Sequence, residues 1–372
     1  MMIGSIKKKV FQNLINIPGW RTTRKIIVFE SDDWGALRMP SKSVYNKLLT
    51  KGIAVEKSYY NQNDSLESNN DLDALFSVLK KFKDKNNNPA VFTALSIVAN
   101  PDFDKIRSND FTAYEFESVK ETLKRYGTSH NNVINLWHEG INEGVFYPEF
   151  HGREHLNVNR WMNILTDQES ITRKCFDHNF YGIGQEKGVN YLPAFDFDNE
   201  IELDDQKIIL KEGISLFRQV FSYQPRFFIA PNFLLSTKLE SFLKANGIDI
   251  LSGARQQKEP LGNDQYKKNF RFTGKENKHG QLFVARNSLF EHGHNAYKFG
   301  WQQTLKDIET AFFWHKPAII STHRVNYIGN INQENRRKGL EQLEELLKNI
   351  VKKWPNVEFM NTTQLAEVIR NS

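Results

Sequence analysis

The chain has 372 residues, of which 39% are hydrophobic and 13% aromatic, enough to build a sizeable globular core. Its net charge of +6 comes from 50 basic and 44 acidic residues, and no stripe of Lys and Arg is interleaved with aromatic side chains. Composition therefore excludes a fibrous or disordered chain and argues against a nucleic-acid partner.

The single cysteine, Cys175, excludes an internal disulfide framework and a cysteine-based zinc site. No apolar run approaches the length of a transmembrane segment, and polar residues interrupt 10–17, so a secretion signal is not expected. We therefore expect a cytoplasmic protein. Residues 1–24 form an N-terminal segment in which 3–17 are interpreted as a docking helix. The alternative is a basic amphipathic helix in peripheral contact with a membrane.

From residue 25 onward, segments with strand character alternate with segments of helical periodicity. The expected strands are 26–29, 90–98, 147–150, 226–230, 248–251, 281–286, 318–322 and 357–360. The expected helices are 44–49, 71–82, 114–125, 131–140, 158–165, 204–221, 236–245, 304–314 and 333–352, followed by a closing helix. This alternation predicts an α/β fold with a parallel sheet, open or closed into a barrel, over residues 25–372. The polar stretch 254–280 is expected to leave the main fold.

Two adjacent aspartates, Asp32 and Asp33, follow the first expected strand, and Gly35 permits a tight turn after them. Active sites of parallel α/β folds lie at the carboxyl ends of the strands. Two like charges this close raise the pKa of one carboxyl group unless a cation binds there. Taken alone, the segment is explained equally well by a capped turn with solvated aspartates.

His151 and His155 are four positions apart, and on a helical turn this spacing would let both imidazoles bind one metal ion. Together with one carboxylate they would form a three-ligand site that leaves a position for water, and the adjacent aspartate could serve as general base. His323 ends a later strand, where it could protonate a leaving group. For each histidine alone, a satisfied buried imidazole is the alternative.

Two further groups of polar residues, at 291–294 and 195–198, are expected to lie on the surface without a functional role. The histidines of 291–294 are expected to be solvated in a loop, with a second metal pair or a substrate contact as the alternative. Residues 195–198 are expected to form an exposed acidic turn, with a position in the cleft as the alternative.

Three motifs resemble those of the polysaccharide deacetylase family, also called carbohydrate esterase family four. Residues 31–35, Ser-Asp-Asp-Trp-Gly, are similar to the first motif, Thr-Phe-Asp-Asp-Gly, with Trp34 inserted before the glycine. Residues 151–155, His-Gly-Arg-Glu-His, are similar to the second motif, His-Ser/Thr-x-x-His. Residues 322–323 resemble the last motif, whose histidine is the general acid.

The resemblance implies a distorted, incomplete β/α barrel. It implies that Asp33, His151 and His155 bind a divalent metal, for which we expect zinc. It also implies that Asp32 is the catalytic base and His323 the general acid. The interval between Asp33 and His151 exceeds the usual one, so a large insertion is expected before the second motif.

The chain departs from the family at the third motif, Arg-x-Pro-Tyr, because Ile229 occupies the arginine position. In the family this arginine braces the catalytic base, and Arg153, Arg286 and Arg324 are the candidates to replace it. The backbone N–H of Phe233 could still contact the oxyanion. The fourth motif has no clear match, with Trp301 a weak candidate. The expected substrate-binding residues are Trp34, Arg153, Pro231, Asn232, Phe233 and Arg324.

The leading hypothesis is a metal-dependent hydrolase that removes an acetyl group, N-acetyl rather than O-acetyl, from a sugar or glycan. A carbohydrate-binding protein with weak or no turnover on the same fold is one alternative, because the third-motif arginine is missing. A metal-dependent amidase that acts outside carbohydrates is another.

Overall fold

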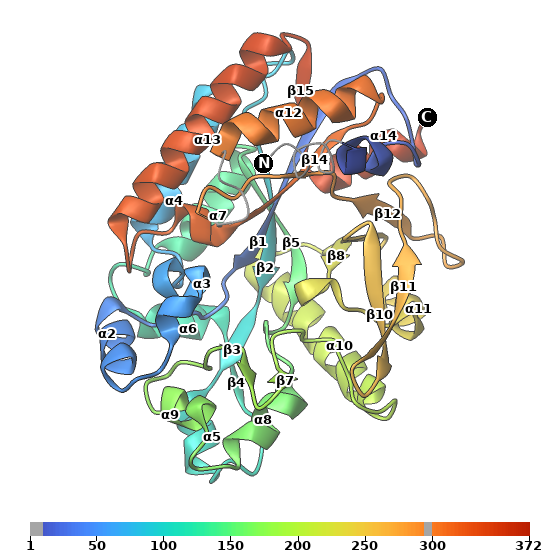
Figure 1. Cartoon of the computed structure of the whole chain (residues 1–372). Coiled ribbons are helices and arrows are strands. Elements are labelled where there is room, and N and C mark those ends of the chain that lie inside the picture. The colour runs from blue at the N-terminus through green and yellow to red at the C-terminus, as the bar shows by residue number, and fades with distance from the viewer. Residues whose placement is uncertain (1–9, 294–299) are drawn as a thin grey trace.

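A computed structural model describes residues 10–293 and 300–372 of the chain (Figure 1). Its main feature is a nine-stranded sheet in the order β12-β9-β8-β5-β2-β1-β14-β13, with β15 paired to β1. The strands are β1 (Lys25–Trp34), β2 (Phe92–Ile97), β5 (Phe146–Gly152), β8 (Phe227–Ile229), β9 (Ile250–Gly253), β12 (Leu282–Ala285), β13 (Ser288–Leu289), β14 (Ala318–His323) and β15 (Val357–Phe359). Every pair in this sheet is parallel, which confirms the expected α/β class.

Both faces of the sheet are buried, as is usual for parallel strands with helical crossovers. In β1, Ile27 and Phe29 pack into a core shared with the surrounding helices. Ile26 and Val28 point to the opposite face and pack into a second core, which also contains Leu365 of the last helix. The sheet thus curls around one core while helices cover its outside (Figure 1).

The helices lie between the strands along the chain and carry apolar stripes toward the sheet. They are α2 (Lys42–Thr50), α3 (Tyr59–Asn63), α4 (Asn69–Lys81), α5 (Phe103–Ser108), α6 (Val119–Arg125), α7 (Val133–Asn142), α8 (Val158–Leu165), α9 (Ile171–Phe176), α10 (Glu202–Phe221), α11 (Glu240–Ala245), α12 (Gly300–Phe313), α13 (Gln333–Lys353) and α14 (Thr362–Arg370). Short 3-10 turns are η1 (Val55–Lys57), η2 (Pro231–Phe233), η3 (Thr237–Leu239) and η4 (Arg324–Tyr327).

The barrel closes through one bent segment rather than through a regular strand pair. Residues 282–285 of this segment pair with β9, and residues 288–289, after only two intervening residues, pair with β14. Between them, the side chain of Asn287 accepts from the Ile319 N–H and donates to the Pro317 carbonyl, each at 2.9 Å. The expectation of a distorted, incomplete barrel is confirmed, and the irregularity is concentrated at this seam.

The interval between Asp33 and His151 contains the sheet strand β2, two helical connections and a small antiparallel pair. This pair is β3 (Ala99–Pro101) with β4 (Phe116–Ser118). The helix expected over 114–125 was predicted too long, because it begins only after Ser118, whose side chain caps it.

Outside the sheet, β10 (Gln256–Gly262) and β11 (Gln265–Phe270) form a hairpin within the polar stretch 254–280. A second small hairpin joins β6 (Gln185–Glu186) and β7 (Val189–Asn190). Residues 10–15 are helical, whereas positions 3–9 of the expected N-terminal helix lie outside the described residues. Within 10–293 and 300–372, no helix is both long and apolar enough to cross a membrane.

Candidate active site

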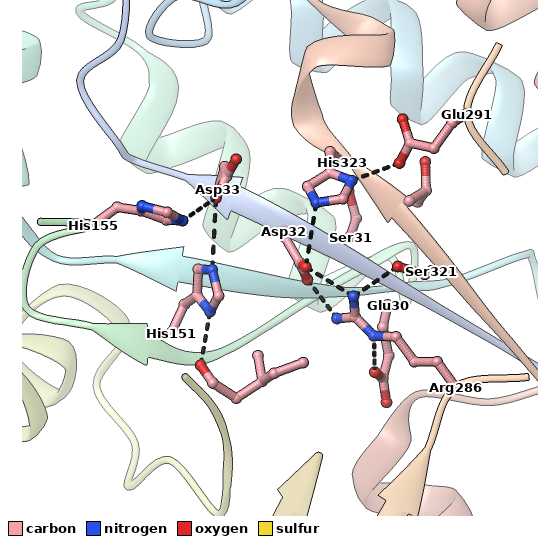
Figure 2. A network of polar contacts seen from close by, with 12 residues as sticks. Glu30, Ser31, Asp32, Asp33, His151, His155, Arg286, Glu291, Ser321 and His323 are labelled. Atoms are coloured by element: carbon pink, nitrogen blue, oxygen red, sulfur yellow. Dashed lines mark hydrogen bonds and ion pairs between the residues drawn. The ribbon is translucent and has the colours of Figure 1, made fainter. Parts of the chain in front are cut away.

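The carboxyl end of β1 places two carboxylates in different environments. Pairing of β1 with β2 shifts register between Ser31 and Trp34, and Asp33 adopts a left-handed φ of 79°. Gly35 follows with φ 78°, and a Cβ there would lie 2.3 Å from the Ile97 carbonyl oxygen. This irregular strand end turns Asp32 and Asp33 toward separate sets of partners (Figure 2).

Asp33 lies beside the two histidines of the predicted metal site. Its Oδ1 is 3.6 Å from Nε2 of His151 and 3.3 Å from Nε2 of His155. One ligand atom from each of the three residues lies within 4.8 Å of the others. The pair does not lie on a helical turn, because His151 is the next-to-last residue of β5 and His155 lies in the bend after the strand. Gly152, with φ 143°, lets the chain reverse between them.

The arrangement of polar atoms fits a bound cation. Nδ1 of His151 donates to the Ile229 carbonyl at 2.8 Å, which leaves the lone pair of Nε2 directed at Asp33. This Nε2 and Oδ1 of Asp33 are both buried, and neither has a hydrogen-bond partner among the described residues. Two unpartnered buried atoms of this kind are costly unless a ligand satisfies them. One carboxylate and two imidazoles are a common donor set for zinc.

The protonation states suit the same role. Burial would raise the pKa of Asp33, but the charge of Arg38 holds it well below its usual value. Burial lowers the pKa of His155 to about 3, so its imidazole is neutral and able to act as a ligand. Arg38 donates to Oδ2 of Asp33 at 2.8 Å and leaves Oδ1 directed at the histidines.

Asp32 is held by Arg286, which lies in the bend of the barrel seam. The guanidinium donates to both oxygens of Asp32, at 2.5 and 2.8 Å, and its Nε donates to Glu30 at 2.7 Å. Burial opposes ionisation of Asp32, yet Arg286 lowers its pKa below the usual value. Of the three arginines considered as replacements for the third-motif arginine, Arg286 is therefore the one that contacts Asp32.

His323 lies on the other side of Asp32, with Nε2 3.7 Å from Oδ2. Its Nδ1 is 2.5 Å from Oε1 of Glu291, whose other oxygen accepts from Asn326 at 2.9 Å. Burial alone would lower the pKa of His323, but the charge and hydrogen bond of Glu291, with a smaller effect of Asp32, raise it to about 9. The imidazole therefore carries a proton at neutral pH.

Glu291 was missed because its segment was interpreted only as a loop with solvated histidines. Glu291 is buried and His292 is half-buried, whereas His294 lies outside the described residues. One feature of the sequence could have identified Glu291. It follows closely after residues 288–289, which pair with the strand that carries His323. The acidic turn at 195–198 was also misinterpreted in part, because Asp196 is buried and paired with Arg160 at 2.9 Å.

The two aspartates and three histidines face one cavity of about 310 Å³. The sequence also placed Asn232 and Phe233 there, and both line the cavity. The sequence did not predict the wall formed by Arg38, Tyr60 and Tyr181. Loop residues 182–184, which were set aside as too short for a phosphate loop, line the same wall.

Four residues expected to bind substrate lie elsewhere. Trp34 is fully buried against Phe146, and Pro231 is buried within its turn. Arg153 does not line the cavity because it pairs with Glu154 and Glu212.

Arg324 does not line the cavity either, because it forms buried ion pairs with Asp64 and Glu67. The Phe233 N–H expected to contact the oxyanion donates instead to the Ala230 carbonyl at 2.9 Å. Pro231 has no N–H and the Phe233 N–H is already bonded. The backbone N–H of Asn232 is therefore the donor of this turn that could contact an oxyanion.

Comparison with protein-family models gives no match, and no curated protein matches the sequence. Among solved structures, the chain is similar to a provisionally named polysaccharide deacetylase of Mycobacterium smegmatis, with 12% identity and a TM-score of 0.43 over 95% of this chain and 93% of that one. A family 4 acetyl xylan esterase of Clostridium thermocellum has 11% identity and a TM-score of 0.34 over 92% and 91%. A 4-alpha-glucanotransferase of Thermococcus litoralis has 9% identity and a TM-score of 0.44 over 92% of this chain and 40% of that one.

Proposed function

We propose that this chain is a metal-dependent deacetylase of the polysaccharide deacetylase family, acting on an N-acetylated sugar or glycan. One observation carries the proposal: an Asp-His-His cluster adjoins a braced carboxylate and an imidazole whose raised pKa keeps it protonated. A site of this composition can hydrolyse an acetamide, because it places a cation site, a proton acceptor and a proton donor around one cavity.

Asp33, His151 and His155 would hold the ion, with zinc as the expected metal. A divalent ion in such a site lowers the pKa of water and polarises a carbonyl group. Arg38 fixes the orientation of Asp33 through its second oxygen. The Ile229 carbonyl fixes His151 in the same way.

Asp32 would take a proton from the water that attacks the acetyl carbonyl. Its lowered pKa keeps it ionised at neutral pH, and the two hydrogen bonds from Arg286 fix its orientation. As the new bond between the water oxygen and the carbonyl carbon forms, the Asn232 N–H at the cavity wall is the candidate donor to the oxyanion.

His323 would then protonate the departing nitrogen as the bond between carbon and nitrogen breaks. The products are acetate and a free amino sugar. Glu291 keeps the imidazole protonated, so the donor is present before the leaving group forms. An amine is a poor leaving group without this proton, and therefore the arrangement favours N-acetyl over O-acetyl substrates.

The alternative of an inactive carbohydrate-binding protein depended on the missing arginine. Arg286 contacts Asp32 where that arginine was expected to act, which weakens this alternative. An amidase outside carbohydrates needs the same three functions and stays open to experiment. The cytoplasmic location stays a prediction.

The first experiment measures metal content by mass spectrometry in the purified wild type, Asp33→Ala and His155→Ala. His178→Ala, at a histidine outside the cavity, is the matched control. We expect about one divalent ion per chain in the wild type and control and none in the two site variants. Absence of metal in the wild type after incubation with zinc or cobalt would contradict the proposal.

A second experiment measures acetate release from N-acetylated sugars, O-acetylated sugars and simple N-acetyl amides. Release from the sugars, fastest from the N-acetyl compounds, is the expected result. If only the simple amides react, the sugar assignment is wrong while the metal site stands.

A further inference from the structure

A second hollow, an apolar groove of about 900 Å³, adjoins the candidate active site. One wall is the N-terminal segment, with Phe11 and Leu14, and another comes from the hairpin, with Phe270. The floor includes Arg286, the residue that holds Asp32. Phe233 lines both this groove and the catalytic cavity. A molecule in the groove can therefore extend to the catalytic residues.

The rim of the groove exposes large apolar side chains to solvent. Phe11 is 62% exposed, Leu14 58% and Phe270 58%. Val10 and Ile17 are also exposed, so the segment 10–17 presents four large apolar side chains to solvent. Contiguous exposed apolar surface of this kind marks an interaction site for an apolar partner.

The groove also contains a cation without a partner. Nε and Nη1 of Arg255 are buried, and neither forms a hydrogen bond within the described parts of the chain. Asp307, the carboxylate that lines the groove, accepts a hydrogen bond from Gln303. Arg255 as a whole is half-buried, but two buried N–H groups without a partner are costly, and a bound anion would satisfy them.

Other positive charges lie near Arg255. Lys316, whose ammonium donates to the Gly19 and Trp20 carbonyls, is close enough to Arg255 and Arg21 for their charges, together with burial, to lower its pKa to about 8. None of these three cations forms an ion pair within residues 10–293 and 300–372. Arg255, which lines the groove, therefore lies in a region with a local excess of positive charge.

We propose that this groove binds a lipid phosphate, the membrane carrier to which the sugar substrate is attached. Arg255 would contact the phosphate, and Phe11, Leu14 and Phe270 would contact the hydrocarbon chain. An anionic group joined to a long apolar chain matches both the unpartnered guanidinium and the apolar walls. A nucleotide carrier would match the cation but leave most of the apolar surface unused. The sugar part of this inference rests on the proposed function, whereas the binding of the lipid phosphate does not.

The test is co-sedimentation of the full chain with phosphatidylcholine vesicles, with or without a small fraction of dolichyl phosphate. We expect binding to require the lipid phosphate and Arg255→Gln to weaken it about tenfold, the typical effect of one charge-assisted hydrogen bond. Arg255→Lys should restore part of the binding. Arg218→Gln, at an exposed arginine on α10, is the control for loss of charge.

The apolar wall is tested by Leu14→Ser, with Ile208→Ser on α10 as the matched control, since the two side chains are 58% and 57% exposed. Leu14→Ser should reduce vesicle binding and Ile208→Ser should not. Thermal unfolding of each variant establishes that it is folded. Equal binding to plain and phosphate-containing vesicles, or unchanged binding in Arg255→Gln, would overturn the proposal.

Other occupants of the groove give different results. Saturable binding of uridine diphosphate that depends on Arg255, without vesicle binding, would identify a soluble nucleotide carrier instead. A dimer that Leu14→Ser dissociates, again without vesicle binding, would identify a second copy of the chain. Vesicle binding needs neither metal nor turnover, and acetate release from soluble acetyl sugars does not need the groove. Failure of one proposal is therefore distinguishable from failure of the other.

Discussion

Glu291 and His323 form a carboxylate–imidazole pair across neighbouring chain segments, with 2.5 Å between Oε1 and Nδ1. The contact at Nδ1 fixes the orientation of the imidazole ring, so that Nε2 points toward Asp32 and the cavity. Because Glu291 raises the pKa of His323, the same contact sets both the orientation and the charge of the proposed acid.

Glu291→Gln should therefore shift the alkaline limb of the pH–rate profile. In the wild type the acid is protonated below a pKa of about 9 and loses its proton as pH rises through that value. Removing the negative charge lowers this pKa, so kcat/KM should begin to fall at lower pH. The measurement is kcat/KM against pH for both proteins. Superimposable alkaline limbs would show that Glu291 does not act through His323.

Arg286→Gln should move the opposite limb. Arg286 lowers the pKa of Asp32, so its loss raises that pKa and the acidic limb of kcat/KM should shift to higher pH. The change also leaves Glu30 and Asp32 buried without their cation, which should lower the free energy of unfolding by about 3–5 kcal/mol. Urea unfolding measures the second effect. Arg153→Gln, which breaks another buried pair away from the cavity, should lower stability without the shift of the acidic limb.

Gly35→Ala should destabilise the end of β1. Its Cβ would lie 2.3 Å from a backbone oxygen, and φ is already 78°, so we expect a loss of about 2–4 kcal/mol from overpacking and strain. Gly127→Ala is the control, since φ there is 82° and nothing lies within 4 Å of the added Cβ. It should lose only about 1 kcal/mol. Equal losses in urea unfolding would show that the close contact at Gly35 contributes nothing.

Glu149→Gln should remove part of the pH dependence of stability. Burial raises the pKa of Glu149 to about 7, although the Phe227 N–H, Thr363 and the Arg226 N–H donate to its carboxylate. A carboxyl group with a raised folded-state pKa is ionised more readily in the unfolded chain. Stability therefore falls as pH rises from about 4.5 to 7, by up to about 3 kcal/mol. Urea unfolding at pH 5 and pH 8 should show a smaller difference between the two pH values in Glu149→Gln than in the wild type. The same difference in both proteins would contradict the prediction.

The strands and most helices could be predicted because each has a local signature. Apolar β-branched runs mark β1 and β14, and the stripe of Leu72, Leu75 and Phe76 marks α4. The metal-ligand candidates were also local, since Asp33 and the histidine pair follow strands. The geometry of these residues could not be predicted, because a spacing of four between His151 and His155 is compatible with a helical turn and also with a strand followed by a bend.

Contacts between distant segments could not be read from the sequence. Arg286 contacts Asp32 across 254 positions, and no spacing rule separates it from Arg153 or Arg324. Glu291 was hidden for the same reason, since its role depends on which strand its segment pairs with. Arg38 and Tyr181 reach the cavity from connections whose course depends on packing of the whole barrel.

The seam of the barrel has a consequence for how activity arises during folding. Arg286 lies in the bend between β12, which pairs with β9, and β13, which pairs with β14. Its guanidinium therefore reaches Asp32 only after both ends of the sheet have met. In a chain with an open barrel, Asp32 would lack both its cation and the orientation that the two hydrogen bonds from Arg286 fix. Under the proposed function, the carboxylate that would act as base is therefore oriented by the same event that completes the tertiary structure.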